Sequence, residues 1–89
     1  MSHVAKDKKK LVARTRRING QVASLERALE SDQDCHAILQ QIAAVRGAVN
    51  GLMLEVLEGH LREHVAPTMG KRNRAELDPV VTLLKRYLK

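Results

Sequence analysis

Hydrophobic residues recur at helical spacing in three separate segments of the chain. In residues 6–30 the aliphatic side chains follow one another at intervals of three, four or seven, which places them on one stripe of an amphipathic helix. The members of this stripe are Leu11, Ile18, Val22, Leu25 and Leu29. Residues 30–34 are rich in side chains that favour turns and helix N-caps, so we expect the chain to reverse there.

The second segment, residues 35–65, carries the strongest pattern. Its apolar residues alternate at spacings of three and four, which is the heptad pattern of a helix that packs against other helices. The seam consists of Ile42, Val45, Val49, Leu52 and Val56, and it is widened by Leu39, Met53, Leu57 and Leu61. An unbroken helix of this length measures about 45 Å, at about 1.5 Å per residue.

The remaining residues predict a linker and a short third helix. Residues 66–76 combine proline, glycine and charge, as linkers do. Asp78 followed by Pro79 is a typical helix start, with the aspartate as N-cap and the proline at the first helical position. The third helix, residues 78–88, then has its apolar stripe at Leu77, Val81, Leu84 and Leu88.

The long helix is too long to be covered within one chain. The 89 residues make a single domain, residues 1–89, and a globule of this size is roughly 25 Å across. Two shorter helices therefore leave much of the seam exposed. We predict an all-α fold, a three-helix subunit with one long central helix, whose long helices pack antiparallel or cross in an obligate oligomer.

Composition indicates an aliphatic core and a polyanionic partner. The chain has no Trp, no Phe and one Tyr, and its formal net charge is +6. Basic residues crowd the first helix, with Asp7 as the acidic residue nearby; they are Lys6, Lys8, Lys9, Lys10, Arg14, Arg16 and Arg17. Such a cluster fits contacts to DNA phosphates. Because the aromatic residues that stack on single strands are missing, double-stranded DNA is the favoured partner.

The cysteine count and the hydropathy pattern bear on location. A single cysteine, Cys35, builds no internal disulfide framework, and the N-terminal residues contain no apolar stretch of signal-peptide length. No uninterrupted apolar run reaches the roughly 18 residues of a membrane span. We therefore expect a cytoplasmic protein with no membrane partner.

Four residues are candidate metal ligands: His3, Cys35, His60 and His64. The two histidines of the long helix lie four apart, so both imidazoles project from one face and can share one ion. Cys35 lies about 37 Å away along the same helix, so it reaches that ion only from a neighbouring antiparallel chain. Three imidazoles, a thiolate and further nitrogen or oxygen donors suit Ni(II) or Co(II).

Each of these residues also has a purely structural interpretation. His60 and His64 fit two surface histidines near a helix end, where they interact favourably with the helix dipole. Cys35 fits a small buried cysteine at a helix start. His3 fits a tail residue without a role.

Residues 60–64 also match His-x-x-Glu-His, the inverted zinc-protease motif. Such an enzyme needs a third ligand on a scaffold and a walled substrate cleft. An elongated bundle of 89 residues offers little for either. We therefore expect neither an enzyme nor a small organic substrate.

Together these features resemble the CsoR/RcnR family of metal-responsive bacterial transcriptional repressors, over essentially the whole chain. The resemblance is carried by RTRRINGQ at residues 14–21, by CHAILQQIAAVRGAVNGLM at residues 35–53 and by the His60/His64 pair. It implies an antiparallel dimer that forms a four-helix bundle, and a dimer of dimers without a helix-turn-helix motif. It also implies that the metal-free tetramer binds operator DNA and represses a metal efflux gene, and that metal releases the DNA.

Within the family, the ligand set resembles the nickel/cobalt branch, with Cys35 supplied by the neighbouring subunit and Glu63 as a further candidate ligand. The copper branch carries a second cysteine where His64 stands, the persulfide branch needs two cysteines, and the formaldehyde branch uses an N-terminal proline where this chain has Ser2. The expected DNA contacts are Lys8, Lys9, Lys10, Arg14, Arg16, Arg17 and Arg46.

Several alternatives stay open. Cys35 with His60 can also hold Cu(I) or Zn(II), and Cys35 is the residue through which the same fold would sense formaldehyde. A metal-independent DNA-binding protein would share the charge and the helices, and a metal buffer would share the ligands.

Overall fold

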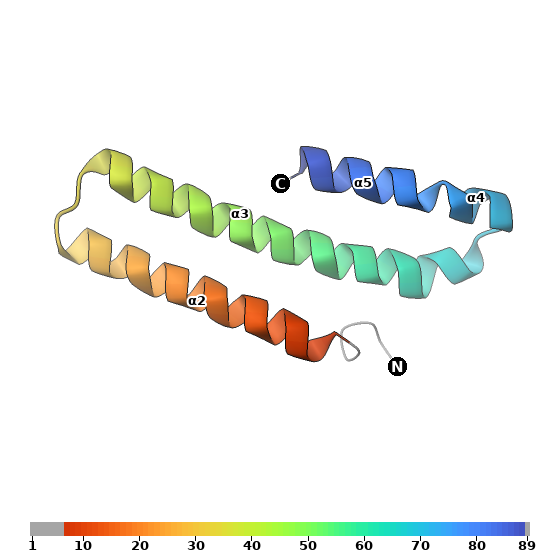
Figure 1. The fold of residues 1–89 in the computed structure, drawn as a ribbon, viewed down its shortest axis with the longest axis horizontal. Helices are drawn as coiled ribbons and strands as arrows, with labels where there is room; N and C mark the ends of the chain where they lie inside the picture. The colour runs from red at the N-terminus through yellow and green to blue at the C-terminus, as the bar shows by residue number, and fades with distance from the viewer. Residues whose placement is uncertain (1–6, 89) are drawn as a thin grey trace.

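The structure, a computed structural model, describes residues 7–88, and these residues form helices and turns with no strand among them. Two helices, α2 (Lys8–Glu30) and α3 (Cys35–His60), make an antiparallel hairpin. Beyond α3 the chain reverses and returns through α4 (Lys71–Ala75) and α5 (Leu77–Tyr87), so that α3 lies between α2 and α5 (Figure 1). The predicted three-helix subunit with one long central helix is confirmed. His3 and Lys6 lie outside the described residues.

The reversal between α2 and α3 follows from its polar residues. Asp34 is the N-cap of α3, and its side chain accepts a hydrogen bond of 2.8 Å from the Ala37 backbone N–H. Asp32 has a φ of 58°, a left-handed conformation that aspartate adopts more readily than most residues. The turn predicted at residues 30–34 is therefore confirmed, with Asp34 as the cap.

The long helix changes form near its end. The sequence predicts a helix over residues 35–65, whereas the α-helix ends at His60 and continues as a π-helical turn, Leu61–Val65. The Ala66 N–H donates to the Leu61 carbonyl in this wider turn. Pro67 supplies the physical reason, because its ring has no N–H for the carbonyl four residues earlier and would clash with it in an α-helix.

The linker expected at residues 66–76 is largely helical, which corrects the sequence prediction. Ala66–Thr68 is a 3₁₀ turn, and α4 follows after two residues. The Arg74 guanidinium donates to the carbonyls of Ala66 and Met69 at 3.1 and 3.3 Å and so holds α4 against this turn. Proline and glycine thus mark a tight reversal here, because proline is tolerated in the first turn of a helix.

The start of α5 also differs from the prediction. Asp78 is the second residue of α5 and does not cap it, because Glu76 already has helical dihedral angles that continue from α4. The Asp78 carboxylate instead lies 2.6 Å from the Arg62 guanidinium. Asp78 therefore pairs with Arg62, which lies 16 residues earlier, and does not accept a hydrogen bond from the backbone as the sequence pattern predicted.

The chain is a thin slab with little core. Its extents are 56 × 27 × 11 Å, so it is one layer of helices thick. The radius of gyration is 17.0 Å, against about 12 Å for a globular domain of this length. Ala66, Leu77 and Val81 pack together under α5, with Leu61 against them. The other buried hydrophobic residues are Leu11, Ala28 and Leu54.

Large apolar side chains remain exposed on every long helix. Leu39, Ile42, Val49, Met53 and Leu57 of α3 are between 38% and 59% exposed. A shallow apolar groove of about 530 Å³ runs along this helix and is lined by Val49, Leu52, Met53, Val56, Leu57 and His60. The predicted seam is therefore uncovered within one chain.

The helical segment that contains α3 is strongly apolar. By length and composition alone, the helical segment Cys35–Thr68 could cross a membrane. Polar and charged residues interrupt this segment, so it contains no unbroken apolar run of about 18 residues. Glu55 and Glu58 lie on this segment and form ion pairs with neighbouring helices. A core helix of an assembly has the same composition as a membrane span.

Candidate metal and nucleic-acid sites

His60 and His64 lie side by side at the end of α3. Their ring centres are 5.3 Å apart and their ring planes are inclined by 39°. A metal-bound imidazole has its ring centre roughly 3 Å from the ion, so two rings at this spacing can flank one metal. His64 lies in the π-helical turn, and such turns are frequent at functional sites. Glu63 occupies the same turn.

Cys35 lies at the opposite end of the same helix. It is the first residue of α3, and its thiol is exposed, so the interpretation as a buried structural cysteine does not fit the single chain. The 26 residues from Cys35 to His60 span about 38 Å. Among residues 7–88, no three His, Cys, Asp or Glu side chains gather in a way that could hold a metal ion. The fourth candidate, His3, lies outside the described residues.

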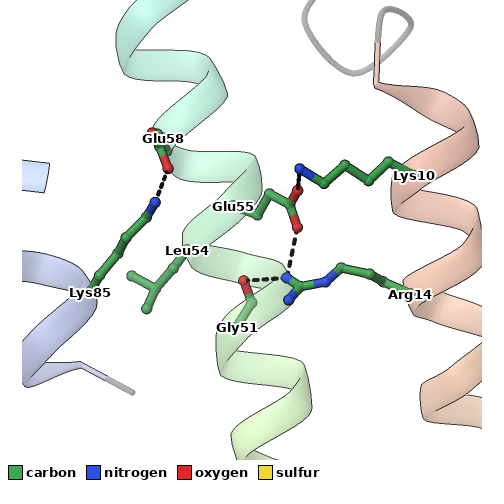
Figure 2. Close-up of a pocket in the computed structure, with 7 residues that line it drawn as sticks. All are labelled: Lys10, Arg14, Gly51, Leu54, Glu55, Glu58 and Lys85. Carbon is green, nitrogen blue, oxygen red and sulfur yellow. Dashed lines mark hydrogen bonds and ion pairs between the residues drawn. The ribbon is translucent and has the colours of Figure 1, made fainter. Parts of the chain in front are cut away.

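The basic residues of α2 divide into two groups. Lys8, Lys9, Arg16 and Arg17 are exposed, as is Arg46 of α3, and none of them makes an ion pair with a described residue. Lys10 and Arg14 point toward α3 and meet one carboxylate, that of Glu55 (Figure 2). The expectation that Asp7 is the nearby acid of this cluster is therefore incomplete.

Glu55 binds both cations in a bidentate arrangement. Its Oε1 lies 2.8 Å from Lys10 Nζ and its Oε2 lies 2.6 Å from Arg14 Nη1. Arg14 Nη1 also donates to the Gly51 carbonyl at 3.3 Å. The hydrogen bond from Lys10, followed by the charge of Arg14, holds the pKa of Glu55 below its ordinary value, and the same contact raises the pKa of Lys10.

A second ion-pair network joins the end of α3 to α5. Glu58 lies 2.5 Å from Lys85 and 3.0 Å from Arg62, and Arg62 continues to Asp78. These bonds, first that of Lys85, hold the pKa of Glu58 below its ordinary value. Arg62 is placed between the two histidines in sequence, so this network shares its turns with the candidate metal ligands.

The two networks line a common cavity of about 290 Å³ between the three helices (Figure 2). Sequence reasoning missed Glu55, Glu58 and Lys85, which line it. The available signal was the pair of acidic residues three apart on α3, a helix that carries no other acidic residue. Such a pair indicates cationic partners on neighbouring helices, although it does not say which ones.

Comparison with known proteins places this geometry in context. A family model described as "Metal-sensitive transcriptional repressor" matches residues 7–86. The "Transcriptional repressor RcnR" of Salmonella typhimurium strain LT2 is 51% identical over 90 residues, covering all of both chains. An uncharacterised protein in the bioA 5′ region of Serratia marcescens is 56% identical over 91 residues, with the same full coverage.

A solved structure shares both sequence and fold. It is a variant of the Formaldehyde-Responsive Regulator FrmR from Salmonella enterica serovar Typhimurium, and it matches with a TM-score of 0.64 and 50% identity. The match covers 94% of this chain and 96% of that one.

Proposed function

Because the chain belongs to the family of metal-sensitive transcriptional repressors, we propose that it represses a metal efflux gene by binding operator DNA and releases that DNA on binding Ni(II) or Co(II). The observation that carries the metal assignment is the His60/His64 pair, with ring centres 5.3 Å apart at the end of a helix that begins with an exposed cysteine. As a transcriptional repressor of this family, the chain is not an enzyme. Its place of action is the cytoplasm, where its DNA partner lies.

The metal site spans two subunits in this proposal. Cys35 and His60 lie about 38 Å apart on one straight helix, so one chain cannot bring them to one ion. When two α3 helices pack antiparallel, the start of each lies beside the end of the other. The ligand set is then His3, His60 and His64 with Cys35 of the neighbouring subunit, and Glu63 is a further candidate. This mixed nitrogen and sulfur set suits Ni(II) or Co(II).

The assembly is an antiparallel dimer that pairs into a tetramer. The single-layer shape and the uncovered apolar groove of α3 support it, because exposed aliphatic seams are stable only when another helix covers them. A two-fold dimer buries the same face on both chains. The face carries its apolar residues along most of α3, so the dimer forms a four-helix bundle from α2 and α3 of each chain.

Operator DNA lies against the exposed basic residues in this proposal. The contacts come from Lys8, Lys9, Arg16, Arg17 and Arg46, joined by Lys10 and Arg14 where these leave Glu55. Exposed lysine and arginine side chains along a helix suit contacts to phosphates, which hold the protein on the duplex.

The link between metal and DNA runs through the start of α2. A groove of about 230 Å³, lined in part by Asp7, Lys10, Glu55 and Glu63, joins the start of α2 to the turn that carries His64. Drawing His3 onto the metal would reorder the start of α2 and so shift the basic side chains that it carries. A coupling of about 1 to 3 kcal/mol between the two sites is sufficient for release.

The formaldehyde alternative has a specific observation in its favour, since the FrmR variant matches this chain at 50% identity. That value is close to the 51% of the RcnR relatives, so overall identity does not separate the two signals. Cu(I) and Zn(II) also remain alternatives, since a thiolate and imidazoles bind both.

The test is fluorescence anisotropy of the metal-free protein on its own upstream DNA, followed by titration with Ni(II), Co(II), Zn(II), Cu(I) and formaldehyde under reducing conditions. Tight binding that Ni(II) or Co(II) reverses is the expected result. Release by Cu(I), Zn(II) or formaldehyde alone would keep the repressor and overturn the signal assigned to it. Binding that nothing reverses would overturn gating altogether.

A further inference from the structure

Glu55 is the acidic residue on α3 that faces the basic helix, and it holds two of the cations of α2 (Figure 2). Lys10 and Arg14 lie four residues apart, so both project from the same side of α2. Each oxygen of the Glu55 carboxylate takes one of them. The Glu55 side chain is 19% exposed, against 71% for Lys10 and 40% for Arg14, so the carboxylate lies inward and its two cations lie toward solvent.

A carboxylate in this position offers the two cations what a phosphate offers. Lysine and arginine bind both groups through charge-assisted hydrogen bonds to two oxygens. Each hydrogen bond that Lys10 or Arg14 donates to Glu55 is therefore one that it cannot donate to a DNA phosphate. The Glu55 carboxylate and the DNA phosphate compete for the same two donors, and the carboxylate is always present because it belongs to the chain.

The remaining basic residues of α2 differ from Lys10 and Arg14 in that Glu55 does not pair with them. Lys8, Lys9, Arg16 and Arg17 are exposed and form no ion pair with a described residue, so they meet a phosphate without giving up another partner. Lys10 and Arg14 lie between these two pairs in the sequence. The cluster is thus interrupted at its centre by two cations that are already neutralised.

We propose that Glu55 is an intramolecular competitor for DNA phosphate, which limits the DNA affinity of the metal-free repressor by occupying Lys10 and Arg14. This inference rests on the proposed function, because it requires that α2 faces DNA. Ion pairs with cations this exposed are weak, so carboxylate and phosphate compete on similar terms: Glu55 keeps Lys10 and Arg14 in some complexes and loses them in others, which lowers affinity without abolishing it. The cavity of about 290 Å³ beside the pair gives both side chains room to leave.

Glu58 provides a matched control on the same helix. It lies one turn further on, is similarly half-buried, and pairs with Lys85 and Arg62 rather than with a residue of α2. Glu55→Gln and Glu58→Gln therefore remove the same charge and change net charge equally. The two variants differ in whether they release cations of the basic helix.

The experiment measures operator binding of the metal-free wild type, Glu55→Gln and Glu58→Gln by anisotropy across a range of salt concentrations. Each additional phosphate contact steepens the slope of log K against log salt by about 0.9 and raises affinity roughly five- to tenfold near 0.1 M salt. We expect Glu55→Gln to bind more tightly with a slope steeper by up to two contacts, at most about 1.8. Glu58→Gln is expected to keep the wild-type slope.

Two further variants make the result specific. In a Lys10→Ala/Arg14→Ala background, Glu55→Gln is expected to add nothing, because no cation remains to be released. Glu55→Asp keeps the charge and shortens the side chain by one methylene, which moves the carboxylate away from Lys10 and Arg14. It replaces Glu55→Gln if that variant fails to fold, and it is expected to give a smaller gain in operator affinity. Circular dichroism and oligomeric state confirm that each variant is folded.

The outcomes separate the two claims. A wild type without operator affinity contradicts the proposed function. A wild type that binds, with Glu55→Gln binding equally or more weakly, overturns the competitor and leaves the repressor intact. An equal gain in Glu55→Gln and Glu58→Gln also overturns it, because the gain would then come from net charge.

Discussion

In the proposed function, metal affinity depends most directly on the two imidazoles at the end of α3. We predict that His64→Ala lowers the affinity for Ni(II) by more than tenfold, since even partners outside the coordination sphere are worth about 10- to 100-fold. Competition against a chelator measures the change. Asn19→Ala is the control, because Asn19 is exposed on α2 and is not a candidate ligand. Equal losses in the two variants would contradict the assignment of His64.

DNA affinity depends on individual cations in a way that salt reveals. Arg17 is exposed on α2 and makes no ion pair with a described residue. We predict that Arg17→Ala weakens apo DNA binding and reduces the salt slope by about 0.9, the value of one phosphate contact. Arg27→Ala, in the last turn of the same helix, is expected to leave the slope unchanged. A slope that Arg17→Ala does not alter would remove Arg17 from the contact surface.

At this scale, sequence spacing predicts contacts between residues of one helix and misses those between helices. His60 and His64 are four apart, and the helix alone brings their rings together. Arg14 and Glu55 are 41 residues apart, and their contact depends on the register of α2 against α3. Periodicity says which face of each helix is apolar, but it does not fix that register.

Among the elements, α5 is held to α3 by charge as well as by its apolar stripe. We predict that Glu58→Gln lowers the free energy of unfolding at pH 7 by about 0.5 to 1 kcal/mol, the usual range for partly exposed ion pairs. The pKa of Glu58 is lowered in the folded chain by Lys85 and Arg62. Its contribution is therefore complete above the ordinary value of 4.5 and is lost as pH falls through the lower folded pKa.

Urea unfolding of wild type and Glu58→Gln at fixed protein concentration, between pH 7 and pH 3, measures this contribution. The difference between the two proteins is expected to shrink toward zero as pH falls below 4.5 and through the lower folded pKa of Glu58. Glu55 titrates in the same range in both proteins and cancels from the comparison. Glu26→Gln, at an exposed site on α2, is expected to match the wild type. A difference that stays constant with pH would show that Glu58 does not act through its charge.

The extent of each long helix follows from the sequence, and the form of the connections does not. Aliphatic periodicity locates α2 and α3, because one apolar face per helix must be buried. The π-helical turn, the helical stretch α4 and the early start of α5 depend on Pro67, Arg74 and Arg62, whose partners lie in neighbouring turns. Proline and glycine in a sequence mark a reversal without saying whether it is an open linker or a run of short helices.

For the whole molecule, the exposed apolar face of α3 is the surface through which we propose that the chain assembles. Met53 is 59% exposed and lines the apolar groove. We predict that Met53→Glu dissociates the oligomer, because a two-fold interface would bury the new carboxylate in both subunits. Light scattering coupled to size exclusion measures the change. Gln40→Glu, about 140° round the same helix, is the control. A tetrameric Met53→Glu would show that this face is not the interface.

The sequence predicts that the apolar face of the long helix is left uncovered, because a helix of about 45 Å is longer than the diameter of an 89-residue globule. The structure agrees, with a slab 56 Å long and 11 Å thick. The same dimensions separate Cys35 from His60 and leave the metal ligands of one chain apart. In the proposed function, the shape and the positions of the candidate ligands are both explained by one partner, a second copy of the chain.

The most direct test of this account mixes two defective chains. Cys35→Ala carries the histidines, and His60→Ala/His64→Ala carries the cysteine, so neither alone forms a complete site. Mixed oligomers, co-expressed with two affinity tags and purified through both, contain one complete site in every antiparallel dimer that pairs one chain of each kind. The account predicts that Ni(II) or Co(II) releases DNA from the mixed oligomers and from neither parent. Mixed oligomers that remain as unresponsive as both parents would contradict a metal site shared between subunits.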